Sequence, residues 1–122
     1  MKTREETTES HDLIDIALDA ASEKKAIDPV VLDVSQLLQI VDDFVIVSGA
    51  NRRQVSTLVE EIETKLKAAG FRPLRTEGAN EGEWVLLDYG EVVIHVFLDE
   101  VRRFYDLERL WADAPRRSGV EV

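Results

Sequence analysis

The sequence predicts a single α+β domain with about five strands and three helices. Three stretches of the 122-residue chain carry this prediction. Residues 83–111 read as a β-hairpin followed by a helix, and residues 44–47 form an unbroken apolar run typical of a strand buried on both faces. Residues 52–69 carry apolar side chains at helical spacing. Because small domains of this class pack helices against a sheet, the three stretches together indicate one sheet covered by helices.

Composition narrows the class of protein. Hydrophobic residues make up 44% of the chain and charged residues 33%, which is typical of a globular domain with one core. We therefore expect one domain over residues 11–115, a loose N-terminal tail over residues 1–10 and a short C-terminal tail over residues 116–122. The chain has no cysteine, which excludes disulfides, thiolate metal sites and a cysteine nucleophile.

The net charge of −10 bears on the choice of partner. Such a chain repels phosphate backbones and attracts basic proteins, so we expect little direct contact with nucleic acid. No apolar run approaches the roughly 20 residues of a membrane span, and the polar, acidic N-terminus resembles neither a secretory signal nor an Arg-rich presequence. These features predict a soluble, cytoplasmic protein without a membrane partner.

The first half of the chain predicts one helix and two strands. Ser10 is the expected N-cap of a helix over residues 11–24, in which apolar residues recur at helical spacing. A strand over residues 27–34 has Pro29 near its start, where the missing N–H of proline is tolerated. After a linker, residues 44–47 form the buried central strand.

The second helix has the clearest boundaries. Asn51 is its expected N-cap, and Gln54 completes an approximate capping box. Gly70 follows the helix where a left-handed residue is favoured, so the helix should cover residues 52–69. Residues 71–75 read as an outer strand because a proline interrupts them, and residues 76–83 as a loop.

A hairpin is predicted from two apolar runs, residues 84–87 and 92–97, that flank a turn. Gly90 can adopt the positive φ that a tight turn requires. If Tyr89 and Gly90 form the turn, Trp84 lies opposite His95.

The two faces of this hairpin differ in chemistry, because side chains alternate along each strand. One face is aliphatic and belongs in the core: Val85, Leu87, Val92, Ile94 and Val96. The other face mixes aromatic, acidic and imidazole groups: Trp84, Leu86, Asp88, Glu91, Val93, His95 and Phe97. The mixed face is the candidate functional surface. The alternative is that helices cover both faces and that Trp84 and Phe97 are core residues.

A third helix is predicted after the hairpin and before Pro115. Its expected apolar stripe consists of Val101, Phe104, Leu107, Leu110 and Trp111. Of these residues, Phe104, Leu110 and Trp111 are expected in the core. Its polar side should expose Arg102, Arg103 and Tyr105.

An enzymatic alternative rests on Ser48-Gly49, which lies between a strand and a helix as in nucleotidyl transferases. Such enzymes also need two carboxylates that hold Mg²⁺. Asp88 and Glu91 lie three residues apart across a turn, which does not direct both at one ion. A nucleotide-binding or nucleotidyltransferase-type enzyme with an atypical site therefore remains the alternative, and no catalytic, metal or cofactor residue is assigned.

A serine hydrolase would need Ser48 or Ser35 with His95, but the sequence has no nucleophile elbow. The two histidines lie far apart in the sequence, which does not favour a zinc site.

Five motifs in order resemble one family. They are Val31-Leu32-Asp33-Val34-Ser35; Asp43-Phe44-Val45-Ile46-Val47-Ser48-Gly49; Arg53-Gln54-Val55; Glu77-Gly78; and Trp84-Val85-Leu86-Leu87-Asp88-Tyr89-Gly90 with His95-Val96-Phe97 and residues 103–111. Together they are similar to the Iojap family, the ribosomal silencing factors, over about residues 13–115. Where many relatives have threonine, this chain has Val41.

The resemblance implies a mixed sheet with a topology like that of nucleotidyl transferases but without their catalytic carboxylates. It also implies a non-enzymatic protein that binds the large ribosomal subunit through its fourteenth ribosomal protein. Bound there, family members block subunit joining when nutrients run short, and they form homodimers when the ribosome is absent.

The same resemblance suggests which residues bind the partner. Trp84, Leu86, His95 and Phe97 would form the desolvated centre of the interface. Glu77 and Asp88 would pair with basic groups at the rim, and Arg102 and Tyr105 would add polar contacts.

Overall fold

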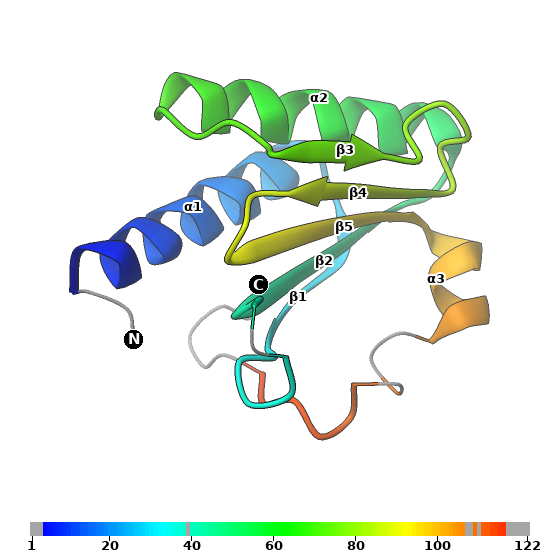
Figure 1. The fold of residues 1–122 in the computed structure, drawn as a ribbon. Helices are drawn as coiled ribbons and strands as arrows, with labels where there is room; N and C mark the ends of the chain where they lie inside the picture. Colours follow the sequence, from blue (N-terminus) through cyan, green and yellow to red (C-terminus); the bar gives the residue numbers. More distant parts are fainter. Residues whose placement is uncertain (1–3, 39, 107–108, 110, 117–122) are drawn as a thin grey trace.

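The computed structural model describes residues 4–38, 40–106, 109 and 111–116, and it confirms the α+β class. In this part of the chain there are three helices and five strands (Figure 1). In chain order they are α1 (Arg4–Glu23), β1 (Ile27–Asp33), β2 (Asp43–Gly49), α2 (Arg52–Ala68), β3 (Arg75–Glu77), β4 (Trp84–Asp88), β5 (Val92–Leu98) and α3 (Asp99–Tyr105).

The strands form one mixed sheet in the order β1-β2-β5-β4-β3. The β2–β5 pair is parallel, whereas the other three pairs are antiparallel. Every residue of β2 and of β5 is buried, which confirms the prediction that residues 44–47 belong to a strand buried on both faces. The strand predicted over residues 71–75 does lie at the edge of the sheet, but it covers Arg75–Glu77 instead, so residues 76 and 77 are not loop.

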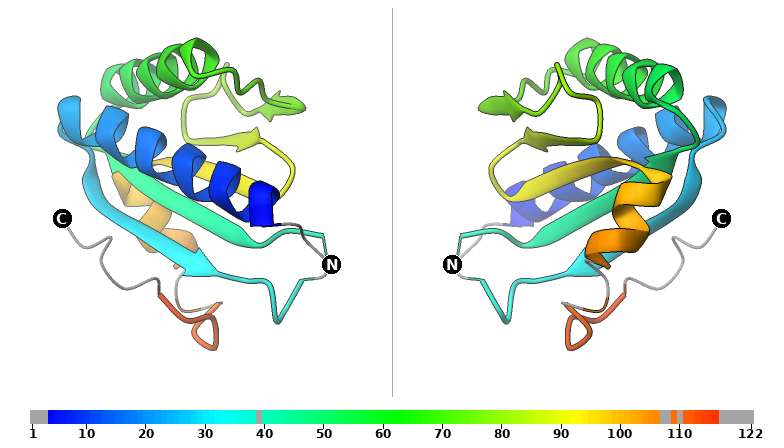
Figure 2. Two further views of the ribbon diagram at one scale, coloured as in Figure 1. Left: turned by 90° about the vertical axis from the view of Figure 1, so that its left-hand side faces the viewer. Right: turned by 90° about the vertical axis from the view of Figure 1, so that its right-hand side faces the viewer.

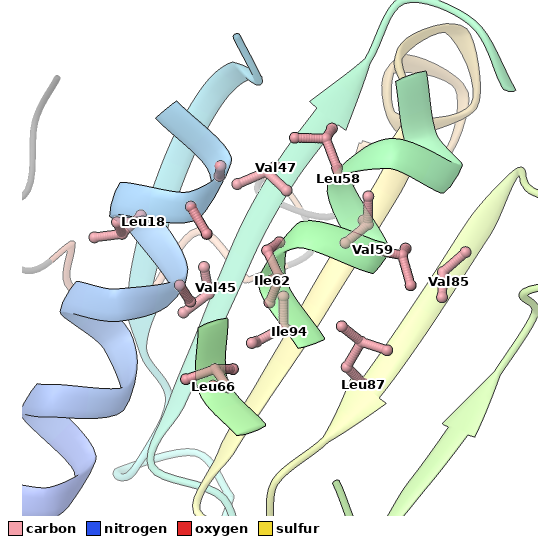
Figure 3. Close-up of a cluster of buried hydrophobic side chains, with 14 of the residues drawn as sticks. Leu18, Val45, Val47, Leu58, Val59, Ile62, Leu66, Val85, Leu87 and Ile94 are labelled. Carbon is pink, nitrogen blue, oxygen red and sulfur yellow. The ribbon is translucent and has the colours of Figure 1, made fainter. Parts of the chain in front are cut away.

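Helices α1 and α2 cover one face of the sheet, and α3 lies on the other side (Figure 2). The aliphatic side chains of β2, β4 and β5 point toward these two helices, as Figure 3 shows for Val45, Ile94 and Leu87. Leu58, Ile62 and Leu66 of α2 meet them and are fully buried. The aliphatic face of the hairpin therefore forms the main core, as predicted from the alternation of its side chains.

The register of the hairpin differs from the prediction by two residues. Trp84 pairs with Phe97 rather than with His95, and Asp88 pairs with Val93. Residues 89–92 therefore connect the paired positions, and Gly90 adopts the expected positive φ of 93°. Because a shift of two residues keeps every side chain on its face, the predicted composition of both faces is still correct.

Helix α1 begins earlier than expected. Residues 4–10, predicted as a loose tail, form its first turns, so Ser10 is inside the helix and is not its N-cap. The Ser10 hydroxyl instead donates a hydrogen bond to Glu91 Oε2 at 2.9 Å. The Ser10 side chain thus makes a contact across 81 positions of sequence and does not cap the helix.

Helix α2 matches its prediction. Asn51 Oδ1 accepts a hydrogen bond from the backbone N–H of Gln54 at 2.8 Å, which caps the first turn. Gly70 has a φ of 94° just after the last turn. Local sequence signals are thus sufficient to set both ends of this helix.

Helix α3 is shorter than the predicted third helix. It ends at Tyr105 because Asp106 adopts a left-handed conformation with a φ of 48°. Phe104 was expected in the core, but 81% of its surface is exposed, so that prediction is wrong. Trp111 lies in a turn beyond the helix and packs against Phe44, whereas Leu107 and Leu110 lie outside the described residues. None of the helices in the described ranges is long and apolar enough to cross a bilayer.

Candidate partner-binding surface

The candidate surface is the mixed face of the sheet, on the side opposite α1 and α2. A second, smaller cluster of buried side chains lies there, built around Phe44, Ile46 and Phe97. Val101 of α3 and Trp111 pack against this cluster. Within the described residues, α3 and the chain around Trp111 therefore cover part of this face.

Aromatic side chains form a continuous row across this face. Ring centroids of successive members lie between 4.7 and 6.2 Å apart. In spatial order the aromatic row consists of Phe104, Tyr105, Trp84, Phe97, His95, Phe44 and Trp111. Distances in this range are those of attractive edge-to-face and offset-stacked pairs, so the rings support one another.

Trp84 lies where the row passes from buried to exposed. Its ring stacks on Phe97 at a centroid distance of 4.8 Å and contacts the ring of Tyr105 at 5.3 Å. Its indole N–H donates a hydrogen bond to Nδ1 of His95 at 3.0 Å. Trp84 is half-buried and 55% of the Tyr105 surface is exposed, so both offer aromatic surface to a partner.

His95 and Phe97 are buried beneath Trp84. Phe97 is fully buried and only 4% of the His95 surface is exposed, so in the free protein these two predicted interface residues offer almost no surface to a partner. Burial lowers the pKa of His95 from 6.5 to about 4. Since its Nδ1 accepts the indole hydrogen bond, the neutral ring carries its proton on Nε2.

Arg102 also lies inside the protein, although the sequence analysis placed it on the exposed side of a helix. Only 5% of its surface is exposed. One guanidinium nitrogen donates to Ser48 Oγ at 2.9 Å and to the carbonyl oxygen of Ile27 at 3.2 Å. Arg102 thus connects α3 to β1 and β2 through hydrogen bonds. Arg103 and Tyr105 are exposed, as predicted.

Arg102→Met should lower the free energy of unfolding by about 2 kcal/mol, because two hydrogen bonds from a charged donor are lost and their acceptors stay buried. Urea unfolding followed by circular dichroism measures this change. Arg103→Met is the matched control, since Arg103 is exposed and pairs with Asp99 on its own helix, and the substitution should cost less than about 0.5 kcal/mol. Equal effects of the two substitutions would show that Arg102 does not anchor α3.

Acidic groups border the surface on the side of β3. Glu77 pairs with Leu86 across the β3–β4 ladder, so its side chain lies on the same face, and 58% of that side chain is exposed. Asp88 is more constrained, because it accepts from the backbone N–H of Gly90 at 2.8 Å and pairs with Arg75 Nε at 3.2 Å. Glu77 is thus the more accessible of the two predicted rim carboxylates.

Phe104 is part of this surface, although sequence reasoning placed it in the core. It lies beside Tyr105, with the two ring centroids 5.2 Å apart. Its exposure could have been predicted if the end of α3 after Tyr105 had been recognised in the sequence. The residue that ends the helix, Asp106, is an aspartate, and aspartate is only a weak sequence signal for a left-handed conformation. We define the docking surface as Trp84, Leu86, Phe104 and Tyr105, with Glu77 at its rim.

The groups of the enzymatic alternative do not meet. Ser48 is level with Phe97 and Trp84 in the sheet, whereas Asp88 is level with Phe44, four residues along the strands or about 13 Å away. Ser48 accepts its hydrogen bond from Arg102, and the Nδ1 of His95 is occupied by Trp84.

Metal binding has no support in the described part of the chain. Among residues 4–38, 40–106, 109 and 111–116, no group of three or more His, Cys, Asp and Glu side chains could hold an ion.

Comparison with known proteins decides the family. The family model described as "Ribosomal silencing factor during starvation" matches residues 7–122. The chain belongs to the ribosomal silencing factor family. This result confirms the resemblance that the five sequence motifs carry.

Individual relatives are similar to this chain over most of its length. A protein named ribosomal silencing factor from Chromobacterium violaceum is 39% identical over 103 residues, which is 84% of each chain. A crystal structure of a protein from the same organism superposes with a TM-score of 0.80 at 38% identity and covers 84% of this chain and 85% of that one. A mouse protein named "Mitochondrial assembly of ribosomal large subunit protein 1" is 32% identical over 101 residues, 80% of this chain but 44% of its own length. The bacterial relative is named as a silencing factor, which denotes a regulator rather than an enzyme.

Proposed function

We propose that this ribosomal silencing factor binds the large ribosomal subunit through its fourteenth ribosomal protein and so prevents the small subunit from joining. Repression of this kind would act in the cytoplasm when nutrients are limiting. The observation that carries the proposal is the docking surface, in which exposed aromatic rings lie beside acidic groups on a sheet face that the helices leave partly open.

The chemistry of this surface suits a basic protein partner. Aromatic side chains are the residues that most often anchor protein interfaces, and Tyr105 and Trp84 are held in place by ring contacts before a partner arrives. Ribosomal proteins are usually basic, so the net charge of −10 favours their approach and disfavours direct contact with RNA. Glu77 at the rim lies 3.9 Å from Arg75 Nη1, but 58% of its side chain is exposed, so its carboxylate can also reach a lysine or arginine of the partner.

Steric exclusion requires no reaction at this surface. A domain of 13.8 kDa bound at the face where two subunits meet occupies volume that the second subunit needs. The separation of Ser48 from Asp88 by four residues along the strands is consistent with this mechanism. In the absence of ribosomes, the exposed rings of Phe104 and Tyr105 would be covered by pairing with a second copy.

Glu77→Lys tests the location of the surface through co-sedimentation with isolated large subunits. We expect the substitution to weaken binding about two- to tenfold, because a favourable rim charge becomes a repulsive one. Light scattering of mixed large and small subunits should show a matching loss of the block on joining.

Glu60→Lys is the control, because it makes the same change of charge on the exposed face of α2, away from the docking surface. It should bind as the wild type does. Equal weakening by both substitutions would mean that only net charge matters, and absence of wild-type binding would refute the proposed function.

A further inference from the structure

The orientation of Trp84 depends on a side chain that cannot itself reach a partner. An indole N–H is a donor only, and in a half-buried position it requires an acceptor. For Trp84 that acceptor is Nδ1 of His95, 3.0 Å away on the neighbouring strand. Leu86 is the direct cross-strand partner of His95, so the hydrogen bond runs diagonally across the β4–β5 ladder.

His95 is itself held firmly. Phe44 meets its ring edge-on at a centroid distance of 4.7 Å, and Phe97 lies nearly parallel to it at 6.2 Å. Its Nε2 is buried and has no hydrogen-bond partner among the described residues. A buried N–H without a hydrogen-bond partner lowers the stability of the folded protein, and an apolar side chain at this position would not carry that cost. Its hydrogen bond with Trp84 is the feature that a leucine or phenylalanine could not supply.

We propose that His95 is a positioning residue of the docking surface, which fixes the indole of Trp84 in the orientation that the partner binds. Phe97 supports the flat side of the indole, and His95 sets its rotation by holding the N–H. The inference rests on the proposed function, because it assigns a role within the same surface. The low pKa of His95, about 4 as a result of burial, keeps Nδ1 an acceptor throughout the neutral range.

A purely structural role for His95 would have different consequences. It would make any substitution lower the stability of the protein while the folded fraction still bound normally. The positioning role instead distinguishes two substitutions by their chemistry. His95→Leu removes the acceptor, whereas His95→Asn retains an oxygen at about the position of Nδ1.

The first measurement uses the free protein. The indole N–H signal of Trp84 in ¹H–¹⁵N NMR spectra, assigned with Trp84→Phe, reports its hydrogen bond through chemical shift and hydrogen exchange. We expect a slowly exchanging signal in the wild type and in His95→Asn, and a rapidly exchanging one in His95→Leu. An unchanged signal in folded His95→Leu would overturn the inference.

The second measurement is the affinity for isolated large subunits, with folding of each variant confirmed by circular dichroism. His95→Leu should weaken binding by about five- to tenfold, the value of one hydrogen bond, and His95→Asn should restore most of it. Val93→Ala is the matched control, because Val93 lies two residues away on the same face of β5 and is buried without a polar side chain. It lowers stability but should leave both the indole signal and the affinity unchanged.

The two proposals fail in different ways. If wild-type protein does not bind large subunits, the proposed function fails, and the NMR result alone decides whether His95 orients Trp84. If the wild type binds and folded His95→Leu binds equally well, the docking surface stands and the positioning role is overturned. Equal loss of binding in Val93→Ala and His95→Leu would also overturn it, because stability rather than orientation would then explain both.

Discussion

Gly78→Ala is expected to lower the free energy of unfolding by about 2–5 kcal/mol. Gly78 has a φ of 83°, and a Cβ atom at this position would lie 2.1 Å from the backbone oxygen of Trp84. The left-handed conformation costs an alanine about 1–2 kcal/mol, and forcing the backbones apart adds a further cost of about 1–3 kcal/mol. Because the clash falls on the first residue of β4, the substitution should also disturb the docking surface. Urea unfolding and the fluorescence of Trp84 measure the two effects.

Gly70→Ala separates the clash from the conformational cost. Gly70 has a similar φ of 94°, but an added Cβ would meet no atom within 4 Å. This substitution should therefore cost only about 1–2 kcal/mol and leave Trp84 fluorescence unchanged. If Gly78→Ala were no more destabilising than Gly70→Ala, the result would contradict the close packing of Gly78 against the backbone of β4.

Acidification from pH 7 to pH 4 should destabilise the wild type by about 3 kcal/mol more than it destabilises His95→Leu. Burial lowers the pKa of His95 to about 4 in the folded protein, from 6.5 when the side chain is exposed. Between these values the unfolded chain binds a proton that the folded protein does not, so stability falls as the pH falls. The loss begins near pH 6.5 and is complete below pH 4, where both states are protonated.

The comparison with His95→Leu isolates the histidine. The 25 aspartate and glutamate residues also titrate at low pH, but they are common to both proteins and their contribution largely cancels in the difference. Urea unfolding at several pH values gives the two curves. Parallel curves between pH 6.5 and pH 4 would show that His95 is not held in its neutral form.

Much of the fold could be predicted from the sequence because its signals are local or periodic. The alternation of aliphatic and mixed side chains in β4 and β5 correctly assigned both faces, even though the register was displaced. Both ends of α2 followed from Asn51 and Gly70, which act within one turn of the helix. The end of α3 depends instead on the left-handed conformation of Asp106, which periodicity does not report. For α1 the apparent cap, Ser10, is an interior residue that bonds to Glu91.

The site was less predictable, because burial depends on what lies above a face. Trp84 and Leu86 were correctly expected on one face, since the alternation of side chains along β4 determines it. Glu77 was expected in a loop, and it lies on the same face because β3 pairs with β4. The burial of His95 follows from the packing of Trp84 beside it, and the burial of Arg102 follows from the packing of α3 against β1 and β2. Periodicity in the sequence does not report either contact. Phe104 is exposed because α3 ends at Tyr105, earlier than the apolar spacing predicts.

The strand order has a consequence for how the protein acquires its shape during synthesis. The central strand, β5, comes from the last quarter of the chain, whereas its parallel neighbour β2 lies about 50 residues earlier. Until residue 98 leaves the ribosome, β2 has a partner on one side only and β4 has none of its antiparallel pairs with β5. Pairing over such a separation is slow, and unpaired apolar strands aggregate readily. The nascent chain therefore cannot assemble the docking surface before β5 has been synthesised.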